Sequence, residues 1–280
     1  MATVTVNNNI KAKQFIKCTA DTFKNKGTVI TIVLNNVIKS DMMHIACDLA
    51  SYIACADGGA NRLHDETQGQ VVPNVIIGDL DSLRTDVKRY YETKSDKTKV
   101  IQVIDQDRHD LDKTLQHIHD NREYIITATT STKTTTTTTT SNVDNQKIYL
   151  LVLGALGGRF DHDMANINTL FKWTKHFDSL ILLSEENMVQ LLEPGRHEII
   201  PDRNLEGPTC GLIPIGFPVQ NISTSGLKWN LTKQGLTFGG LVSTSNRIVD
   251  EKIIVDTPDG HLLWTTSFSL NNGSSGSSKS

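Results

Sequence analysis

Between residues 27 and 177 the chain alternates between short apolar runs, typical of buried strands, and longer segments with helical spacing of apolar residues. The apolar runs include GTVITIVLNN, IACADGG, VPNVIIGDLDS and KIYLLVLGALGG, and the helical segments include MMHIACDLASY and ANINTLFKWTKHF. Strands and helices that alternate in this way form parallel sheets, because each helix returns the chain to the start of the next strand. The pattern predicts an α/β domain with a mainly parallel, doubly wound sheet over residues 27–177.

From residue 178 the pattern changes to short apolar runs, such as SLILLSEENMVQLL, GLIPIG, KIIVDTP and LLWTTSFSL, separated by Gly, Pro and Asn turns. This spacing predicts an all-β, sandwich-like domain over residues 178–270. We expect residues 1–26 to be a loose lead-in and residues 271–280 a flexible tail. A low-complexity threonine tract at residues 127–145 is expected to form a surface insertion.

Charge and cysteine usage exclude several classes of protein. The formal net charge is −3, the sequence pI is near 6.3 and no long basic run occurs, so nucleic acid is not an expected partner. The cysteines are scattered, at Cys18, Cys47, Cys55 and Cys210. They contain no C-x-x-C pair, so neither a zinc site nor a disulfide framework is expected. No signal-peptide core and no bilayer-length apolar run occur, so we expect a cytoplasmic protein without membrane contact.

The stretch DQDRHDLDK, from Asp105 to Lys113, places four carboxylates close together after an apolar run. A solvated loop or a helix N-cap would explain it without any ligand. A calcium loop of the EF-hand type is excluded, because Asp110 and Gln116 stand where that loop requires Gly and Glu. The remaining interpretation is the end of a strand that leads into a helix, which is where α/β folds bind ligands.

The stretch GDLDS ends the third apolar run with two carboxylates. Asp79 and Asp81 would lie on the same side of an extended backbone, because side chains alternate with a period of two. Paired oxygen ligands without nearby His or Cys favour a hard divalent cation, and Mg²⁺ is the usual one beside phosphates. The alternative is that the two acids only cap the next helix.

Two further strand ends carry glycine turns. In ADGGANRL, Asp57 is followed by Gly58 and Gly59, where a phosphate or nucleotide could approach the backbone, although a tight turn explains the pair equally well. In GALGGRFDHD, Arg159 could clamp a phosphate, and Asp161 could hold a metal or accept a proton. The alternative is an Arg–Asp pair that ties the loop to the helix.

The chain contains neither a G-x-x-x-x-G-K-[ST] motif nor a G-x-G-x-x-G motif, which argues against a P-loop enzyme and against a dinucleotide dehydrogenase. Because strand ends of a doubly wound sheet converge on one crevice, the acids, glycines and Arg159 together favour metal-dependent phosphoryl transfer. In the β-rich half, Trp229 in TSTSGLKWNLT could stack on a flat or cationic ring. A tryptophan in a strand is more often a core residue.

The motifs ADGGANRL, GDLDS, DQDxxDxxK, LGALGGRFDHDMANINTL, LLSE, GLIPIG, TSGLKWNL and LVSTSN occur together in this order. In this respect residues 28–268 resemble the eukaryotic thiamine pyrophosphokinases. The resemblance implies an enzyme that transfers the intact diphosphoryl group of ATP to the hydroxyl of thiamine, giving thiamine diphosphate and AMP. It also implies Mg²⁺ and a homodimer, with thiamine bound between the α/β domain of one subunit and the β domain of the other.

Carried over by position, the resemblance implies a role for each matching residue. It implies magnesium ligands at Asp79, Asp81 and Asp110, and groups near the phosphates and the attacking oxygen at Arg159 and Asp161. It implies nucleotide contacts at Asp57, Gly58, Gly59 and Asn61, and thiamine-site residues at Gln106, Ser223 and Trp229.

Two features depart from the family pattern. Arg108 and His109 stand where the family motif has apolar or hydroxyl residues, so the resemblance does not fix the fine positioning of the substrate there, and the threonine tract enlarges one loop. Two rival functions remain open at this stage. One is a magnesium-dependent transfer or hydrolysis of a nucleotide with another acceptor, and the other is a non-catalytic thiamine or nucleotide sensor.

Overall fold

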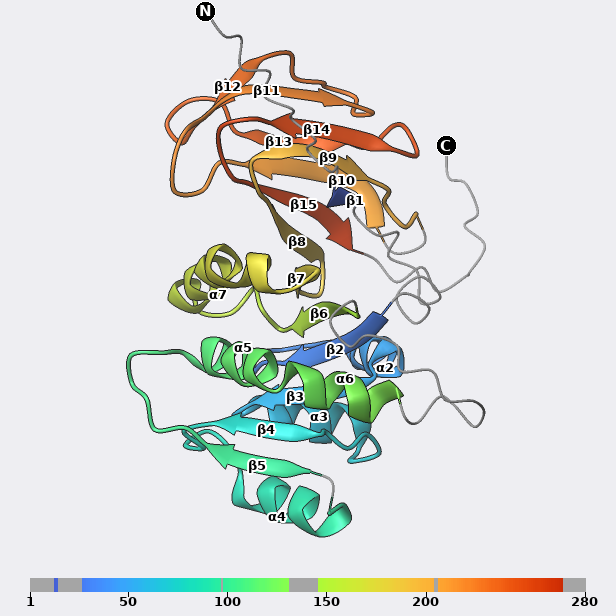
Figure 1. Ribbon diagram of the computed structural model, residues 1–280, viewed down its shortest axis with the longest axis vertical. Coiled ribbons are helices and arrows are strands. Elements are labelled where there is room, and N and C mark those ends of the chain that lie inside the picture. Colours follow the sequence, from blue (N-terminus) through green and yellow to red (C-terminus); the bar gives the residue numbers. More distant parts are fainter. Residues whose placement is uncertain (1–12, 15–26, 97, 131–145, 204–205, 269–280) are drawn as a thin grey trace, which may run out of the picture. The chain divides into compact units, whose positions relative to one another are not determined.

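The computed structural model describes residues 13–14, 27–96, 98–130, 146–203 and 206–268, and the chain divides into two compact units (Figure 1). The first, named here the α/β unit, comprises Thr19–Gln190 with Phe268–Ser280. The second, named the β unit, comprises Met1–Cys18 with Leu191–Ser267. None of the helices in the described ranges has the length and apolar character needed to cross a membrane.

The described part of the α/β unit contains six parallel strands in the order β7-β6-β2-β3-β4-β5, and β8 runs antiparallel beside β7. The strands are β2 (Gly27–Val33), β3 (Tyr52–Ala56), β4 (Val75–Gly78), β5 (Lys99–Gln102), β6 (Lys147–Leu153), β7 (Ser179–Leu183) and β8 (Asn187–Leu192). Every residue of β3 and β4 is buried, and β2 and β6 are buried except at their first residue. Such continuous burial requires cover on both faces of the sheet, and it confirms the predicted parallel sheet.

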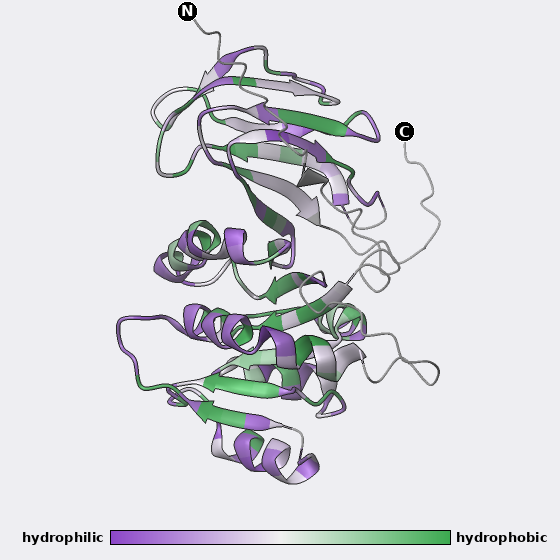
Figure 2. Cartoon of the chain, in the orientation of Figure 1, coloured by the Kyte–Doolittle hydropathy of each residue, from purple (hydrophilic) through white to green (hydrophobic). Residues whose placement is uncertain are grey.

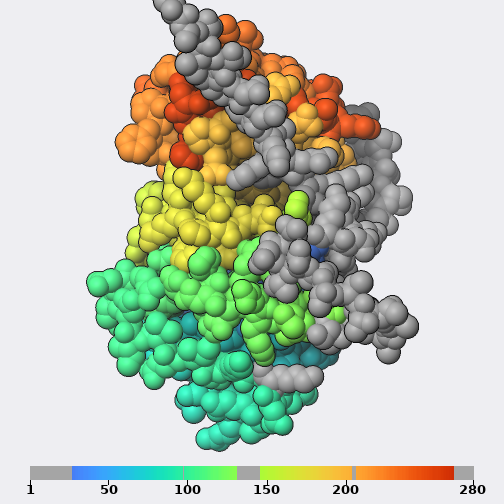
Figure 3. All heavy atoms as spheres, viewed as in Figure 1, coloured from blue at the N-terminus to red at the C-terminus, as the bar shows by residue number. Residues whose placement is uncertain are grey.

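Helices supply this cover. They are α2 (Ser40–Leu49), α3 (Gly59–Thr67), α4 (Thr85–Lys94), α5 (Asp110–Asp120), α6 (Arg122–Thr130) and α7 (Phe160–Trp173), followed by the short 3-10 helix η2 (Thr174–His176). Helix α3 contacts α2 and α4, whereas α5 contacts α6 and α7. In Figure 1 α5 and α6 lie in front of the strands and α3 lies behind them, and in Figure 3 the green spheres of this part of the chain form the face toward the viewer. The sheet is therefore doubly wound, as predicted.

The order of the sheet reverses beside β2. Strands β3, β4 and β5 follow on one side of β2, whereas β6 and β7 lie on the other side. The loops that leave the carboxyl ends of β2 and β6 therefore diverge, and a doubly wound sheet binds its ligand in the crevice opened there. Figure 2 shows the strands mainly in the green of hydrophobic residues and the loop between β5 and α5 mainly in purple.

The β unit consists of short strands around one core. One sheet has the order β1-β9-β14-β11-β12, and β13, β10 and β15 are neighbours in another. The strands are β1 (Lys13–Gln14), β9 (Gly195–Ile199), β10 (Glu206–Ile213), β11 (Val219–Ser225), β12 (Gln234–Leu236), β13 (Ser243–Arg247), β14 (Ile253–Thr257) and β15 (Leu262–Phe268). Ile222 and Val255 from the first sheet and Leu212 and Trp264 from the second belong to the same buried cluster. Two sheets that share a core form a sandwich, which confirms the predicted fold class.

The division between the units differs from the predicted boundary at residue 178. It falls between Gln190 and Leu191, because β7 pairs in parallel with β6, with Leu151 opposite Ile181. The run SLILL is apolar at four consecutive positions and lacks the alternation of a half-buried strand, which is the signal that belongs to a parallel sheet.

The segments expected to be irregular are described only in part. Within the predicted lead-in, Lys13–Gln14 forms β1, which pairs in parallel with β9. Helix α6 extends to Thr130 and so includes the first residues of the predicted threonine insertion. The remainder of the lead-in, residues 131–145 and the predicted tail at 271–280 lie outside the described residues.

Candidate active site

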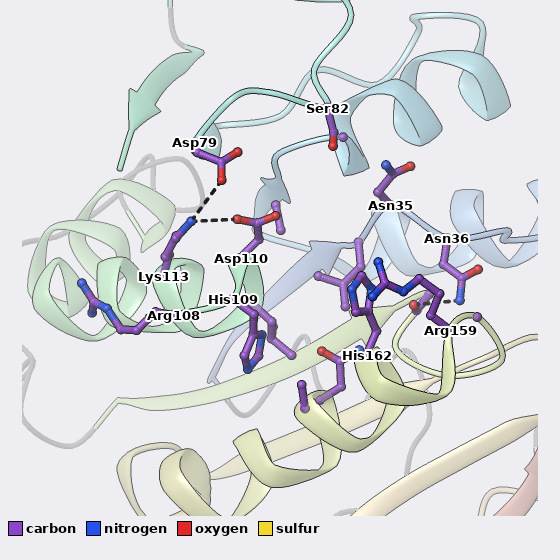
Figure 4. Close-up of a pocket in the computed structure, with 18 of the residues that line it drawn as sticks. Asn35, Asn36, Asp79, Ser82, Arg108, His109, Asp110, Lys113, Arg159 and His162 are labelled. Atoms are coloured by element: carbon purple, nitrogen blue, oxygen red, sulfur yellow. Dashed lines mark hydrogen bonds and ion pairs between the residues drawn. The ribbon is translucent and has the colours of Figure 1, made fainter. Parts of the chain in front are cut away.

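A cavity of about 550 Å³ lies at the carboxyl ends of the parallel strands in the α/β unit (Figure 4). The loops after β2, β3, β4, β5 and β6 and the first turns of α5 and α7 form its wall. Figure 4 shows Asp79 and Asp110 on one side of the cavity, and Arg159 and His162 on the other. The cavity therefore presents acids to one part of a bound molecule and basic groups to another.

Three carboxylates, named here the acid triad, converge beside this cavity. One oxygen each of Asp57, Asp79 and Asp81 lies within 4.8 Å of the other two. The backbone is not extended between Asp79 and Asp81, because Leu80 has a φ of 68°. The N–H of Asp81 donates to Oδ1 of Asp79 at 3.3 Å, so a tight turn brings the two acids together. The predicted alternation along an extended strand was therefore the wrong reason for their proximity.

Asp57 is the buried member of the acid triad, with 1% of its surface exposed. Its Oδ2 accepts the N–H of Ser82 at 3.2 Å, whereas its Oδ1 is buried without a hydrogen-bond partner among the described residues. Burial, together with the charges of Asp110, Asp79 and Asp81, raises the pKa of Asp57 to about 7. An unpartnered buried carboxylate oxygen beside two further acids is the donor set of a hard cation, so these residues fit a divalent metal.

Asp110 begins α5 and faces the acid triad across a buried lysine. Lys113 Nζ donates to Asp110 Oδ1 at 3.2 Å and lies 3.7 Å from Asp79 Oδ2 (Figure 4). Only 2% of the Lys113 side chain is exposed. The hydrogen bond from the Asp81 N–H is the main factor that lowers the pKa of Asp79, and the charge of Lys113 adds to it.

Arg108 and His109, the two residues expected to depart from the family pattern, each have a hydrogen-bond partner. Arg108 Nε donates to Asp105 Oδ2 at 2.7 Å, and this hydrogen bond is the main cause of the lowered pKa of Asp105. His109 Nε2 lies 2.9 Å from Thr169 Oγ1 and links α5 to α7, while burial lowers the pKa of His109. Gln106, between these residues, lines the cavity.

The loop after β6 carries Arg159, the residue predicted to bind a phosphate. Arg159 lines the cavity, and its Nη2 lies 2.5 Å from Oδ2 of Asp161. Both side chains are mostly exposed, and the hydrogen bond from Arg159 lowers the pKa of Asp161. Asp161 is not among the described residues that line the cavity. The loop-to-helix pair named as the alternative is thus the arrangement present, and it leaves Asp161 a weak base.

The four predicted nucleotide residues have different places: Asp57 belongs to the acid triad, Gly58 lines the cavity, and Gly59 and Asn61 hold neighbouring elements together. A Cβ on Gly59 would lie 2.0 Å from the carbonyl oxygen of Val33, so Gly59 allows α3 to approach β2. The Asn61 side-chain amide donates to the Ser82 carbonyl at 2.8 Å, and Oδ1 of Asn61 accepts the Arg84 N–H at 3.1 Å. Asn61 therefore holds the loop after the acid triad.

Ser223 and Trp229 lie in the β unit. Ser223 Oγ accepts the N–H of Lys233 at 3.1 Å. Trp229 is 56% exposed, and Lys228 Nζ lies 4.5 Å from the centre of its ring. Trp229 is therefore not a core residue, in contrast to Trp264, which is 2% exposed. The ring is exposed and already has a cation over it, which is the kind of contact a flat cationic ligand would make.

Sequence reasoning assigned no role to several residues that build the cavity. Asn36 donates to the carbonyls of Gly154 and Leu156, at 3.3 and 3.2 Å, and so joins the loops after β2 and β6. Lys113 and His162 also line the cavity. Lys113 is the last residue of the acidic stretch DQDRHDLDK. Its spacing of three residues from Asp110 on a predicted helix was the signal that could have indicated an ion pair between them.

Comparison with known proteins matches both parts of the chain to domains of one family. The family model "Thiamin pyrophosphokinase, catalytic domain" matches residues 43–182, and "Thiamin pyrophosphokinase, vitamin B1 binding domain" matches residues 196–262. Thiamine pyrophosphokinase 2 of Arabidopsis thaliana is 39% identical over 255 residues, which cover 86% of this chain and 87% of the relative.

Two solved structures extend the comparison. Yeast thiamin pyrophosphokinase superposes with a TM-score of 0.75 at 25% identity, over 95% of this chain and 94% of that one. Thiamin pyrophosphokinase from Candida albicans gives a TM-score of 0.72 at 26% identity, over 87% of this chain and 90% of that one.

Proposed function

We propose that this chain, which belongs to the thiamine pyrophosphokinase family, transfers the intact diphosphoryl group of ATP to the hydroxyl of thiamine, giving thiamine diphosphate and AMP. The observation that carries the proposal is the acid triad beside a cavity at the switch point of the sheet, within the residues that match the family's catalytic domain. In the reaction the thiamine hydroxyl oxygen forms a bond to the β-phosphorus and releases its proton. The bond between the β-phosphorus and the oxygen retained by AMP breaks.

Asp57, Asp79 and Asp81 would hold Mg²⁺, with Asp110 at the same side of the cavity. The predicted metal set was Asp79, Asp81 and Asp110, and the unpartnered Oδ1 of Asp57 is the reason to add Asp57. The bound cation would neutralise polyphosphate charge and make the β-phosphorus easier to attack.

The remaining side chains would bind and orient the substrates. Arg159 would turn from Asp161 toward the phosphates, because a bidentate guanidinium matches phosphate as well as carboxylate. The Gly58 backbone would border the nucleotide, and Gln106 would contact the group in transfer. Ser223 and the exposed face of Trp229 would contact thiamine, whose thiazolium charge favours an aromatic ring.

Two further parts of the proposal concern the assembly and its compartment. We propose a homodimer whose active sites lie at the subunit interface, each using the acid triad of one subunit and Trp229 of the other. We propose a cytoplasmic location, which the free buried thiols of Cys47, Cys55 and Cys210 support, since such compartments keep thiols reduced.

The test is to incubate the purified protein with ATP, Mg²⁺ and thiamine, and to resolve nucleotides and thiamine esters by chromatography. Equimolar AMP and thiamine diphosphate are expected. Formation of ADP with thiamine monophosphate, or nucleotide hydrolysis without a thiamine ester, would support the rival enzymes. Thiamine binding without any turnover would support the sensor.

A further inference from the structure

Lys113 is a buried cation in the wall of the cavity. It extends from the first turn of α5, and its Nζ lies 3.2 Å from Asp110 Oδ1 and 3.7 Å from Asp79 Oδ2. Only 2% of its side chain is exposed, although it lines the cavity. The ammonium thus lies between a member of the acid triad and the acid at the start of α5 (Figure 4).

The fold by itself gives no reason for an ammonium at this place. Burying a charge costs free energy even when it is paired, and well-packed apolar residues often replace a buried ion pair without loss of stability. The pair formed by Lys172 of α7 and Asp112 of α5 shows an arrangement in which the ammonium loses less hydration. Lys172 Nζ lies 3.1 Å from Asp112 Oδ2, but 49% of the Lys172 side chain remains in solvent.

The position of Lys113 sets two electrostatic effects against each other. A divalent cation that binds to Asp79 in the absence of a nucleotide meets the positive charge of Lys113 close to that carboxylate. Like charges at short range repel strongly in a partly buried site. A polyphosphate in the cavity meets the same charge as an attraction. The negative charge of the polyphosphate also screens the metal from the ammonium.

We propose that Lys113 couples the metal to the nucleotide, by weakening the binding of a bare divalent cation and strengthening the binding of the metal–polyphosphate complex. The nucleotide identity of this polyphosphate rests on the proposed function. Lys113 would touch the polyphosphate and is therefore a substrate-binding residue as well as the counter-charge of the acids.

The first experiment measures Mn²⁺ binding to the full-length protein without nucleotide, by electron paramagnetic resonance of the free ion. Lys113→Met is expected to bind Mn²⁺ about tenfold more tightly than the wild type, because the repelling charge is gone. Lys113→Gln, which keeps a polar end, is expected to behave alike. The matched control is Lys172→Met, which removes the same charge from a pair outside the cavity wall and should leave the Mn²⁺ affinity unchanged.

The second experiment measures binding of α,β-methylene-ATP with Mg²⁺, an analogue whose bridge cannot be cleaved between the α- and β-phosphorus. Both neutral variants are expected to bind it at least about tenfold more weakly than the wild type. Opposite shifts for Mn²⁺ and for the analogue are the expected signature, since a variant with a damaged site would lose affinity for both.

Weaker or unchanged Mn²⁺ binding in both neutral variants would overturn the proposal and assign Lys113 to holding the acids in place. Failure of both neutral variants to fold, seen by circular dichroism, would assign it to the fold and overturn the proposal as well. The proposed function fails separately. Wild-type protein that makes no thiamine diphosphate would contradict it, while the Mn²⁺ comparison would still decide the role of Lys113.

Discussion

Asp81 is the exposed member of the acid triad, so its removal is expected to separate an effect on catalysis from an effect on folding. We expect Asp81→Ala to keep its melting temperature and to lose at least about a hundredfold in turnover, because an electrostatic stabiliser of the reacting phosphate is lost. Steady-state assays with saturating ATP and thiamine measure the effect. Asp86→Ala, a change of an exposed acid in the next helix, is the control, and equal turnover in both variants would refute the metal assignment.

A substitution of Trp229 tests the proposed thiamine site. Trp229→Ala should raise the Michaelis constant for thiamine about tenfold, as for loss of a cation–π contact, and leave that for ATP unchanged. Phe238→Ala removes another exposed ring of the β unit, 65% exposed, and should change neither constant. An effect of Trp229→Ala on ATP alone would contradict the role.

Glu206 predicts how the stability of the β unit depends on pH. Its Oε1 accepts the Asp202 N–H at 2.9 Å and its Oε2 accepts the Thr266 hydroxyl at 3.0 Å, while burial raises the pKa of Glu206 from 4.5 to about 7. The folded state therefore holds the proton more tightly than the unfolded state. The stabilisation is complete below pH 4.5 and is lost as the pH rises through 7.

Glu206→Gln mimics the protonated form and should remove this dependence. Between pH 4.5 and pH 7.5 we expect the wild type to lose about 2 kcal/mol more of its free energy of unfolding than the variant does, measured by urea denaturation. Glu198→Gln, at a partly exposed ion pair with Lys252, should follow the wild type. Parallel curves for the wild type and Glu206→Gln would show that Glu206 does not titrate in this range.

At the scale of elements, the approach of α3 to β2 depends on one glycine. Alanine normally stabilises a helix by about 1 kcal/mol over glycine, but a Cβ on Gly59 would lie 2.0 Å from the Val33 carbonyl oxygen. The clash with backbone outweighs the helix preference. We expect Gly59→Ala to lower the melting temperature by more than about 5 °C. In Gly58→Ala the nearest atom belongs to the Asn35 side chain, which accepts a hydrogen bond from Arg62 Nε but can shift more easily than backbone, so the fall in melting temperature should be smaller.

Sequence reasoning located the elements better than it located their ends. Strands β2, β3, β4 and β6 were predictable because each is a continuous apolar run, and α5 because Leu111, Leu115 and Ile118 share one helical face. The turn at Leu80 was not predictable, since leucine rarely adopts a left-handed backbone and nothing in GDLDS requires it. The acids were therefore found as residues, but their convergence was explained by the wrong geometry.

At the scale of the whole molecule, the order of the strands in the sheet could not be predicted from the sequence. Alternation of strands and helices indicates a parallel sheet, but it does not tell on which side of β2 the later strands lie. The neighbours of β2 are β3 and β6, and this choice opens the crevice. Lys113 escaped notice for a related reason, because its burial beside Asp79 depends on how α5 packs against β4.

The proposed dimer predicts that two variant chains regain activity when they are combined. Asp81→Ala and Trp229→Ala chains, each nearly inactive at low thiamine, should recover about a quarter of wild-type activity when refolded together in equal amounts. Half of the dimers are then mixed, and one of their two sites has both residues intact. Each variant refolded alone is the control. No recovery, with mixed dimers demonstrated by differently tagged chains, would contradict sites shared between subunits.

The central place of β2 has a consequence for synthesis of the chain. Strand β3 follows β2 closely in sequence, whereas β6, which pairs with β2 from Gly27 opposite Lys147 to Val33 opposite Leu153, emerges from the ribosome much later. Until then one edge of an apolar strand is open to other chains, and such edges promote aggregation of incomplete proteins. Nascent chains that end before residue 147 should therefore be the species that most require a chaperone.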